Sequence, residues 1–390
     1  MKALLLFLAS ALANAAALAL GAGPPPPPPP PPPRGAYLAR SAAETRDSFA
    51  SVLCHNTSLL QGQPTTAAND FQRLVVIGDV HGDIRRLQEV LTKARLIASP
   101  QSGCSFNATE RTLVVQMGDV VDRGPSTWES WMCLTELQAS AAAANSTGSR
   151  VVRLLGNHEA LWLQGETEFR NQQHDTPEIV EKLTRQLKQA IMQGDVRATL
   201  SLTLFKDVEL FLSHAGLRPQ MYHQLVARVR TAGGHSSNNN RSSVSGSSIS
   251  EFVNKKVRAD VERCVTSAQA RCRFKDAIYS AGKDRGGKEI GGILWTDWSV
   301  LQQAAEAAGG EPVLPGVIQI VGHTPSISMV KTTYGLGGIC VDVGLYLGGA
   351  GFLEQLPSGH FVAHERDKMT GNWSSRDLMS PVCAEFMQRT

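Results

Sequence analysis

"RLVVIGDVHGD", residues 73–83, places an apolar run directly before three ionisable side chains. Apolar residues 74–77 are typical of a buried β-strand, and the glycines that follow would let the backbone turn sharply where the strand ends. Asp79, His81 and Asp83 then occupy alternate positions. Because burying two carboxylates and an imidazole costs free energy unless a cation neutralises them, the stretch predicts a metal site at the end of a strand.

Further stretches repeat this arrangement of an apolar strand followed by a polar tip that contains glycine. They are "RTLVVQMGDVVDRG" (111–124), "SRVVRLLGNHE" (149–159), "VELFLSHAGL" (208–217), "VIQIVGHTP" (317–325) and "GGICVDVGL" (337–345). Helical patterns lie between them: apolar residues recur at helical spacing over 84–96, and Thr176 with Pro177 predicts a helix that ends at Gly194. Alternating strands and helices predict an α/β architecture whose ligands bind outside the carboxyl ends of the strands.

The polar tips carry side chains that are good ligands for transition metals. The tips supply, in order, Asp79 and His81; Asp119, Asp122 and Arg123; Asn157, His158 and Glu159; His214; and His323. Imidazole, carboxylate and amide oxygen together suit manganese, iron or zinc, and the lack of thiolates argues against a structural zinc site. The alternative is a hydrogen-bond network without metal, which would leave several buried carboxylates facing each other without a cation.

The motifs "GDVHGD", "GDVVDRG", "GNHE", "SHAG" and "VGHT" occur here in an order and spacing that resemble the calcineurin-like metallophosphoesterases. More narrowly, they resemble the phosphoprotein phosphatase superfamily, whose motifs are GDxHG, GDxVDRG, GNHE, HGG and GH. The match runs from about residue 74 to about residue 345. The resemblance implies a central two-sheet β-sandwich flanked by helices, with the active site at the carboxyl ends of the strands.

The resemblance also implies two divalent metal ions, whether manganese, iron or zinc. Asp79 and His81 resemble ligands of the first metal, Asp119 resembles the carboxylate that bridges both, and Asn157, His214 and His323 resemble ligands of the second. Such a pair lowers the pKa of a shared water and clamps phosphate oxygens as charge develops. The implied reaction is direct attack of metal-bound hydroxide on phosphorus, with no phosphoenzyme.

The remaining motif residues resemble groups that handle the substrate. His158 resembles the general acid that protonates the leaving oxygen, and Asp122 would orient that imidazole as the carboxylate of a triad does. Arg123 would grip the phosphate oxygens in a bidentate fashion, beside the amide of Asn157. Arg218 in "HAGLRP" is the candidate for a second phosphate-binding arginine.

Several departures narrow the resemblance. Leu155 precedes the glycine of GNHE, Ala215 replaces the first glycine of HGG, and "CVDVGLYLGGAG" (340–351) stands where the common Ser/Thr phosphatases have "SAPNYC". These features resemble the bacterial-like branch, the Shewanella-like protein phosphatases. The resemblance therefore implies a metal-dependent phosphoric monoester hydrolase that acts on phosphoserine or phosphothreonine, with phosphotyrosine as a further candidate.

Two alternatives stay open. One is a phosphoesterase that acts on a nucleotide or a bis-nucleoside polyphosphate, since the motif residues contact only phosphate and metal. The other is a non-catalytic binding module on the same fold, against which the intact tip residues argue. The expected partner is a phosphoprotein or phosphopeptide, whereas the formal net charge of +3 and the absence of a basic stripe argue against nucleic acid. The sequence predicts no particular regulatory subunit.

Residues 1–23 have the pattern of a secretory signal peptide, with Lys2 before an apolar stretch and small residues near its end. An uncleaved signal anchor is the alternative, because the stretch is long enough to span a bilayer, and it would be the only membrane tether. An organellar transit peptide fits less well, since it would be richer in arginine and serine. The sequence thus predicts the secretory pathway: the ER lumen, a vacuole or lysosome, or the exterior.

The rest of the chain divides by composition. We expect a polyproline II linker over 24–35, an N-terminal extension over 36–69, the catalytic domain over 70–365 with a disordered polar insert at 231–250, and a C-terminal tail over 366–390.

Glycosylation signals and cysteines agree with a secreted protein. Asn-X-Ser/Thr acceptors occur at Asn56, Asn107, Asn145, Asn240 and Asn372, which predicts a glycoprotein. In an oxidising compartment Cys264 and Cys272 could bridge a short loop, and Cys54 with Cys104 is another possible pair. The total of seven cysteines leaves at least one unpaired or intermolecular.

Overall fold

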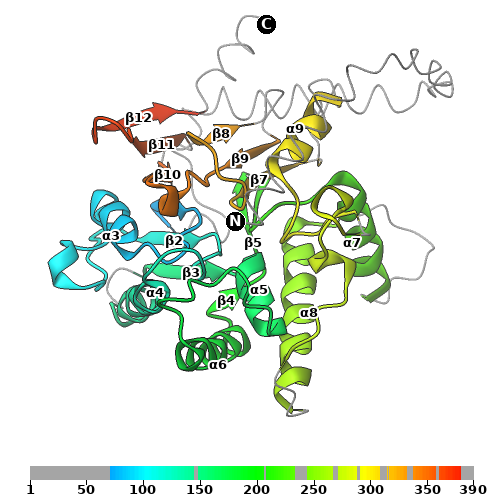
Figure 1. Ribbon diagram of the computed structural model, residues 1–390. Helices are drawn as coiled ribbons and strands as arrows, with labels where there is room; N and C mark the ends of the chain where they lie inside the picture. The colour runs from blue at the N-terminus through cyan, green and yellow to red at the C-terminus, as the bar shows by residue number, and fades with distance from the viewer. Residues whose placement is uncertain are drawn as a thin grey trace, which may run out of the picture. The chain divides into compact units, whose positions relative to one another are not determined.

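Two β-sheets form the centre of the fold, and helices cover them (Figure 1). The computed structural model describes residues 71–144, 148–205, 208–232, 244–266, 271–287, 290–307, 314, 316–331, 337–356 and 360–378, all within the unit Glu44–Thr390. The predicted signal segment, polyproline linker and N-terminal extension lie outside the described residues. No helix of the described part is both long enough and apolar enough to cross a membrane.

The seven-stranded sheet has the order β12-β11-β10-β1-β2-β3-β4. Its strands are β1 (Arg73–Ile77), β2 (Thr112–Gln116), β3 (Arg150–Leu154), β4 (Val196–Arg197), β10 (Gly351–Gln355), β11 (Phe361–Arg366) and β12 (Trp373–Asp377). Strands β1 to β4 run parallel, whereas β10, β11 and β12 are antiparallel to their neighbours. The tips that follow β1, β2 and β3 therefore leave the sheet at the same edge.

The five-stranded sheet has the order β5-β6-β7-β9-β8. Its strands are β5 (Thr199–Phe205), β6 (Val208–Ser213), β7 (Val317–Val321), β8 (Val330–Lys331) and β9 (Gly338–Cys340). Strands β6, β7 and β9 are parallel, so the tips after them also share one edge. The helices are α3 (Ile84–Lys93), α4 (Thr127–Ala143), α5 (Asn157–Gln164), α6 (Pro177–Gln193), α7 (Pro219–Ala232), α8 (Gly246–Thr266) and α9 (Trp298–Ala307).

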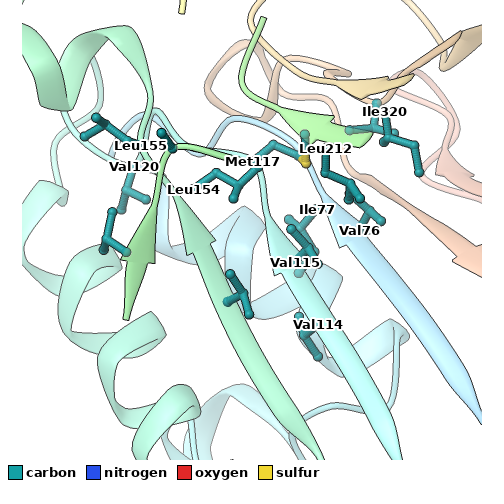
Figure 2. Close-up of a cluster of buried hydrophobic side chains, with 14 of the residues drawn as sticks. Val76, Ile77, Val114, Val115, Met117, Val120, Leu154, Leu155, Leu212 and Ile320 are labelled. Atoms are coloured by element: carbon teal, nitrogen blue, oxygen red, sulfur yellow. The ribbon is translucent and has the colours of Figure 1, made fainter. Parts of the chain in front are cut away.

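The main core lies between the two sheets. Figure 2 shows Val76 and Ile77 of β1 together with Leu212 of β6 and Ile320 of β7, all of them fully buried. Strands that are buried on both faces read as continuous apolar runs, which is why the stretches were recognisable as strands. This packing brings the tips of both sheets to one place, and the predicted α/β fold with two sheets is confirmed.

The predicted helices are present with the expected ends. Helix α3 occupies most of the predicted range 84–96. Helix α6 begins at Pro177, where the Thr176 hydroxyl accepts the N–H of Ile179, and it ends before Gly194 in the left-handed conformation. Its buried face consists of Leu183, Leu187, Ala190 and Ile191.

Two predicted boundaries need correction. The polar insert expected at 231–250 is helical at both ends, because α7 reaches Ala232 and α8 begins at Gly246, where buried Ile249 contributes to the core; residues 233–243 lie outside the described part. The tail expected from residue 366 includes β12, which pairs with β11 through Val362 and Asp377. Polar composition hid this edge strand, since its exposed face needs no apolar residues.

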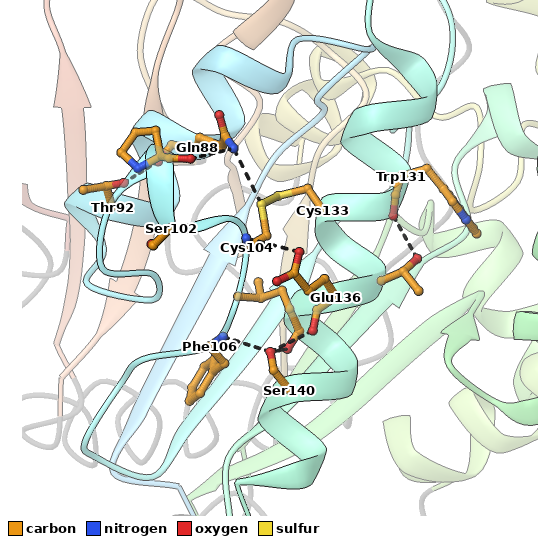
Figure 3. The surroundings of a disulfide bond; sticks show 12 residues. Gln88, Thr92, Ser102, Cys104, Phe106, Trp131, Cys133, Glu136 and Ser140 are labelled. Carbon is orange, nitrogen blue, oxygen red and sulfur yellow. Dashed lines mark hydrogen bonds between the residues drawn. A yellow bond between two sulfur atoms is a disulfide. The ribbon is translucent and has the colours of Figure 1, made fainter.

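Two disulfides connect helices to neighbouring segments. Cys264 and Cys272 are bonded, as expected, and Cys104 bonds Cys133 of α4, so the suggested pairing of Cys104 with Cys54 is wrong. Figure 3 shows the Cys104–Cys133 bond, beside which the Cys104 N–H donates to Glu136 at 3.3 Å. Among the described residues Cys340 is a buried free thiol.

Candidate metal centre and active site

The tips of both sheets converge on a cluster of buried polar side chains. The seven-stranded sheet supplies Asp79 and His81 after β1, Asp119 and Asp122 after β2, and Asn157 and His158 after β3. The five-stranded sheet supplies His214 after β6, His323 after β7 and Asp342 after β9. Each of these side chains is at least nine-tenths buried, so their charges must be balanced within the protein.

Backbone strain concentrates in this cluster. Of the six non-glycine residues with positive φ in the described part, five are cluster residues or their neighbours: His81, Asp119, Asp122, Arg123 and His323. Such conformations cost roughly 1–3 kcal/mol each and persist where the surroundings enforce them. At His81, Asp119, Asp122 and His323 the strained backbone carries a buried side chain, whereas the Arg123 side chain is exposed.

Glu159 holds the strained loops together. One carboxylate oxygen accepts the N–H groups of Asp119 (2.8 Å) and Gly156 (2.9 Å), and the other accepts those of Val120 (2.7 Å) and Val121 (3.2 Å). At Gly156 a Cβ atom would collide with the Asp119 carboxylate, so this position requires glycine. The sequence singled out Glu159 as a tip residue without assigning this role, although a carboxylate in the first turn of α5 is a recognisable signal.

The cluster contains two groups of side chains that could hold a metal ion. In the His158 group, defined as His81, Asp119 and His158, the Nε2 atoms of the two histidines lie 3.6 and 3.8 Å from Asp119 Oδ2. In the His323 group, defined as Asp119, His214 and His323, His214 Nε2 lies 3.4 Å from Asp119 Oδ2 and 3.2 Å from His323 Nδ1. Asp119 belongs to both groups.

Asn157 completes the His323 group. Its Oδ1 lies 2.9 Å from His214 Nε2 and 3.0 Å from His323 Nδ1, so three potential ligand atoms converge on one point. Asp79 lies at the edge of the cluster: its carboxylate accepts the backbone N–H of His323 at 3.1 Å and lies 4.0 Å from His214 Nδ1. It is thus beside the His323 group, outside both groups of ligand atoms.

The histidines present one nitrogen inward because the other donates to a backbone carbonyl. His81 Nδ1 donates to Val121 O at 2.9 Å, and His214 Nδ1 donates to Met117 O at 2.8 Å. This arrangement directs Nε2 of both rings towards Asp119 and is the usual support of a metal-binding histidine. The buried atoms His323 Nε2 and Asp342 Oδ2 have no hydrogen-bond partner among the described residues.

The charges of the cluster also require a cation. Burial, together with neighbouring Asp342, raises the pKa of Asp79 well above its usual value, and burial raises the pKa of Asp342 to about 6. Burial alone would lower the pKa of His214, but Asp119 and Asp79 beside the ring raise it to about 10. A position that keeps an imidazole charged between two carboxylates favours positive charge, so the donor set fits divalent ions.

His158 is held as a proton-transfer group. Its Nδ1 donates to Asp122 Oδ2 at 2.6 Å, and the other oxygen of Asp122 accepts the indole N–H of Trp162 at 2.7 Å. This places Nε2 of His158 next to Arg123, whose Nη2 lies 3.3 Å away. Asp122, itself held by Trp162, therefore fixes both the tautomer and the direction of the His158 imidazole.

Two aromatic side chains stand beside the His158 group. The Phe169 ring lies 5.2 Å from the His158 ring and is 45% exposed. The Tyr346 ring lies 4.8 Å from that of His81, and its hydroxyl accepts an N–H of Arg123 at 2.9 Å. None of these residues, nor Asp342, had been singled out from the sequence, although Asp342 and Tyr346 lie in the quoted stretch 340–351 and Asp342 follows a strand as the other tip residues do.

Arg218 occupies the connection between β6 and α7. Its guanidinium packs against Gly291, where a Cβ atom would lie 3.3 Å from Nη2. Its role as a second phosphate-binding arginine stays a prediction.

Comparison with known proteins places this geometry in a family. Residues 72–261 match the sequence model of the calcineurin-like phosphoesterases. The chain contains a calcineurin-like phosphoesterase domain. This confirms the family resemblance noted in the motifs, and the family's use of divalent metals agrees with the donor set of the phosphoesterase domain.

Curated relatives match parts of this chain. Shewanella-like protein phosphatase 2 of Arabidopsis thaliana is 35% identical over 98 residues, which cover 25% of this chain and 23% of the relative. The symmetrical bis(5'-nucleosyl)-tetraphosphatase of Photorhabdus laumondii is 28% identical over 145 residues, which cover 37% of this chain and 44% of the relative. The chain thus matches less than half the length of either relative.

The fold also resembles that of solved phosphatases. The structure of a cold-active protein tyrosine phosphatase matches with a TM-score of 0.50 and 16% identity, over 79% of each chain. At this identity the likeness concerns the fold alone.

Proposed function

We propose that the protein is a two-metal phosphoprotein phosphatase that hydrolyses phosphoserine and phosphothreonine monoesters, with phosphotyrosine as a further substrate. The observation that carries the proposal is the Asp122–His158–Arg123 arrangement beside two metal-binding groups that share Asp119. The relative named Shewanella-like protein phosphatase 2 supports a phosphoprotein substrate.

The metal ions would be held by the two groups. His81 and Asp119 would hold one ion, with His158 left free for proton transfer, and Asp119, Asn157, His214 and His323 would hold the other. Asp79, predicted as a ligand of the first ion, instead lies beside the His323 group. When bound, two divalent ions neutralise phosphate oxygens and lower the pKa of water. Asp119 contributes to both sites, so each site depends on its position.

The chain's own residues bind the phosphate and deliver the proton. Arg123 is exposed at the opening of the cluster and offers two N–H groups in the fork geometry that phosphate favours. A phosphate bound to Arg123 replaces the contact between Arg123 and His158 and frees Nε2 of His158 to carry a proton. His158 gives this proton to the leaving oxygen, while Asp122 stabilises and orients the imidazole.

A substrate panel with metal analysis tests the proposal. The purified protein should bind manganese, iron or zinc and should hydrolyse phosphoserine, phosphothreonine or phosphotyrosine peptides faster than nucleotides. A protein that binds no divalent metal and hydrolyses no aryl phosphate would instead be a non-catalytic binding module.

A second candidate function is hydrolysis of a nucleotide or bis-nucleoside polyphosphate. The tetraphosphatase of Photorhabdus laumondii favours it, because its match to this chain is longer than that of the Arabidopsis relative. A higher kcat/KM for diadenosine tetraphosphate than for any phosphopeptide in the same panel would establish this candidate and exclude the first.

We also propose that the protein works in the secretory pathway as a glycoprotein. Two disulfides support this, since such bonds persist in oxidising compartments. The acceptors Asn107 and Asn372 are exposed, whereas Asn56, Asn145 and Asn240 lie outside the described residues. A size shift after glycosidase treatment is the expected result, and recovery of unglycosylated protein from the cytosol would contradict it.

A further inference from the structure

A cavity of about 860 Å³ borders the active site through Trp162. The same indole whose N–H binds Asp122 lines this cavity, between α5, α6 and the end of α8. Figure 1 shows these three helices next to one another. The volume lies in the range of pockets that bind ligands, roughly 300–1,000 Å³. No step of the proposed reaction uses this space.

The cavity is strongly cationic. Its lining contains Arg170, Arg185, Lys188 and Arg271 but a single carboxylate, Glu181. Within the described residues, no carboxylate lies at ion-pair distance from the three arginines. Cationic side chains gathered in a concave site with low-dielectric walls attract anions.

The cavity also has apolar and hydrogen-bonding walls. Trp162, Val180 and Met192 contribute apolar surface, and Thr184 has a buried hydroxyl without a hydrogen-bond partner among the described residues. A ligand with acidic groups on a carbon skeleton fits this mixture better than an inorganic ion does.

Arg271 is held at the cavity by its neighbours. Adjacent Cys272 is bonded to Cys264, and its N–H donates to Leu163 O at 2.7 Å. The arginine stem packs against Gly165, where a Cβ atom would lie 2.5 Å from Nε. Because its backbone is fixed before any ligand binds, Arg271 loses less conformational freedom on binding.

One short segment connects the cavity with the reaction centre. Phe169 places its ring 5.2 Å from His158, and the next residue, Arg170, lines the cavity. A peptide whose phosphorylated side chain reaches His158 would therefore pass Phe169 and meet the cationic wall. A small phosphoester would not extend that far.

We propose that this cavity binds an acidic segment of the substrate, next to the phosphorylated residue. The inference rests on the proposed phosphoprotein phosphatase activity and adds a charge preference to it. Carboxylates of the peptide would pair with Arg170, Arg185 and Arg271, while its apolar side chains cover the half-buried Val180 and Met192.

The test compares two phosphopeptides that differ only in glutamate or glutamine on both sides of the phosphorylated residue. The wild-type protein should favour the acidic peptide about tenfold in kcat/KM, since each exposed pair adds a small increment. In the double variant Arg185→Glu/Arg271→Glu this ratio should fall to one or below. Added salt should reduce the ratio in the wild-type protein, because it screens exposed charges.

The matched control is Arg230→Glu, which changes an exposed arginine of α7 away from the cavity lining and should retain the wild-type ratio. Thermal unfolding confirms that each variant is folded. Equal rates on both peptides in the wild-type protein, or an unchanged ratio in the double variant, would overturn the inference. In either case hydrolysis of p-nitrophenyl phosphate and of the peptides would still support the phosphatase activity, whereas failure to hydrolyse any phosphoester would overturn both.

Discussion

The His158 group and the His323 group share Asp119 but have different surroundings. Around the His158 group stand exposed Arg123, half-exposed Phe169 and Tyr346, all of them side chains that a substrate can touch. Around the His323 group stand two half-buried side chains: the Trp295 ring lies 6.1 Å from that of His323, and Asp297 lies 3.9 Å from His323 Nε2. The difference is one of charge: the His158 group has the exposed cation Arg123 beside it and the His323 group has the carboxylate Asp297, so an anionic substrate would first meet the His158 group.

The two groups also differ in protonation, because their histidines have different charged neighbours. Burial lowers the pKa of His81 to about 3, because nearby His158 and Arg123 oppose the pull of its carboxylate neighbour Asp119. His214 is equally buried but lies near two carboxylates, which raise its pKa to about 10. Equal desolvation thus has opposite outcomes, decided by the number and sign of nearby charges.

The largest effect should come from the residue that the groups share. Asp119→Asn should reduce turnover by more than ~10³-fold, because both metal-binding groups lose their common carboxylate. Metal analysis by mass spectrometry should show less than the wild-type content in the same variant. Retention of both full metal content and measurable turnover would show that the two groups are independent.

The next effect should be confined to the His158 group. His158→Asn should leave metal content near that of the wild type and lower turnover by at least ~10²-fold on phosphoserine peptides. The loss should be smaller on p-nitrophenyl phosphate, whose leaving group needs less protonation. Full turnover on the poor leaving group would rule out His158 as the acid.

The stability of the metal-free protein should reveal the opposite protonation of the two groups. His81 has a depressed pKa, so its contribution should destabilise the fold as the pH falls from 6.5 towards 3. His214 has a raised pKa, so its contribution should be complete below pH 6.5 and lost as the pH rises through 10. The free energy of unfolding, measured with urea, should change by at most about 1.4 kcal/mol per pH unit for each histidine.

Single variants separate the contributions of the two histidines to this pH dependence. His81→Gln should reduce the loss of unfolding free energy at acid pH, and His214→Gln should reduce the loss at alkaline pH. If either variant reduced the pH dependence on both the acid and the alkaline side, the two histidines would not titrate separately.

The smallest effect should come from Trp162, which contacts His158 only through Asp122. Trp162→Phe removes the indole N–H that binds Asp122, so turnover on phosphoserine peptides should fall roughly threefold to tenfold, or about 1 kcal/mol. Turnover on p-nitrophenyl phosphate should change less, since only proton delivery is affected. Trp131→Phe is the matched control: it loses a similar bond to Gln186 and should not alter the ratio between the two substrates.

Much of the fold was predictable from local patterns. The run at residues 74–77 is a strand because β1 is buried on both faces, and the Thr176-Pro177 start of α6 depends on neighbouring residues alone. Edge strand β12 and the start of α8 were missed, because their polar sequences resemble loops. Partners distant in the chain stabilise these elements.

Part of the candidate site was also predictable from local patterns, and part was not. The motif residues Asp119, His158 and His214 were all expected at strand ends, and they meet in the structure. Asp119 and His158 meet because parallel strands of one sheet share an edge, whereas His214 joins them because the two sheets pack against each other. Phe169 and Tyr346 could not be found in advance, because nothing in their local sequence distinguishes them from ordinary loop residues. Asp342 was missed although it follows the apolar strand at 338–340 as the other tip residues follow theirs.

The sequence by itself determined which side chains stand at the ends of the buried strands, and therefore the kind of chemistry they can perform. Only the tertiary structure decided which imidazole is charged, that Trp162 joins Asp122 to a cationic cavity, and that Cys104 bonds Cys133. The physical reason is that strand patterns depend on neighbours along the chain, whereas desolvation and Coulomb energies depend on distances between residues that folding alone brings together.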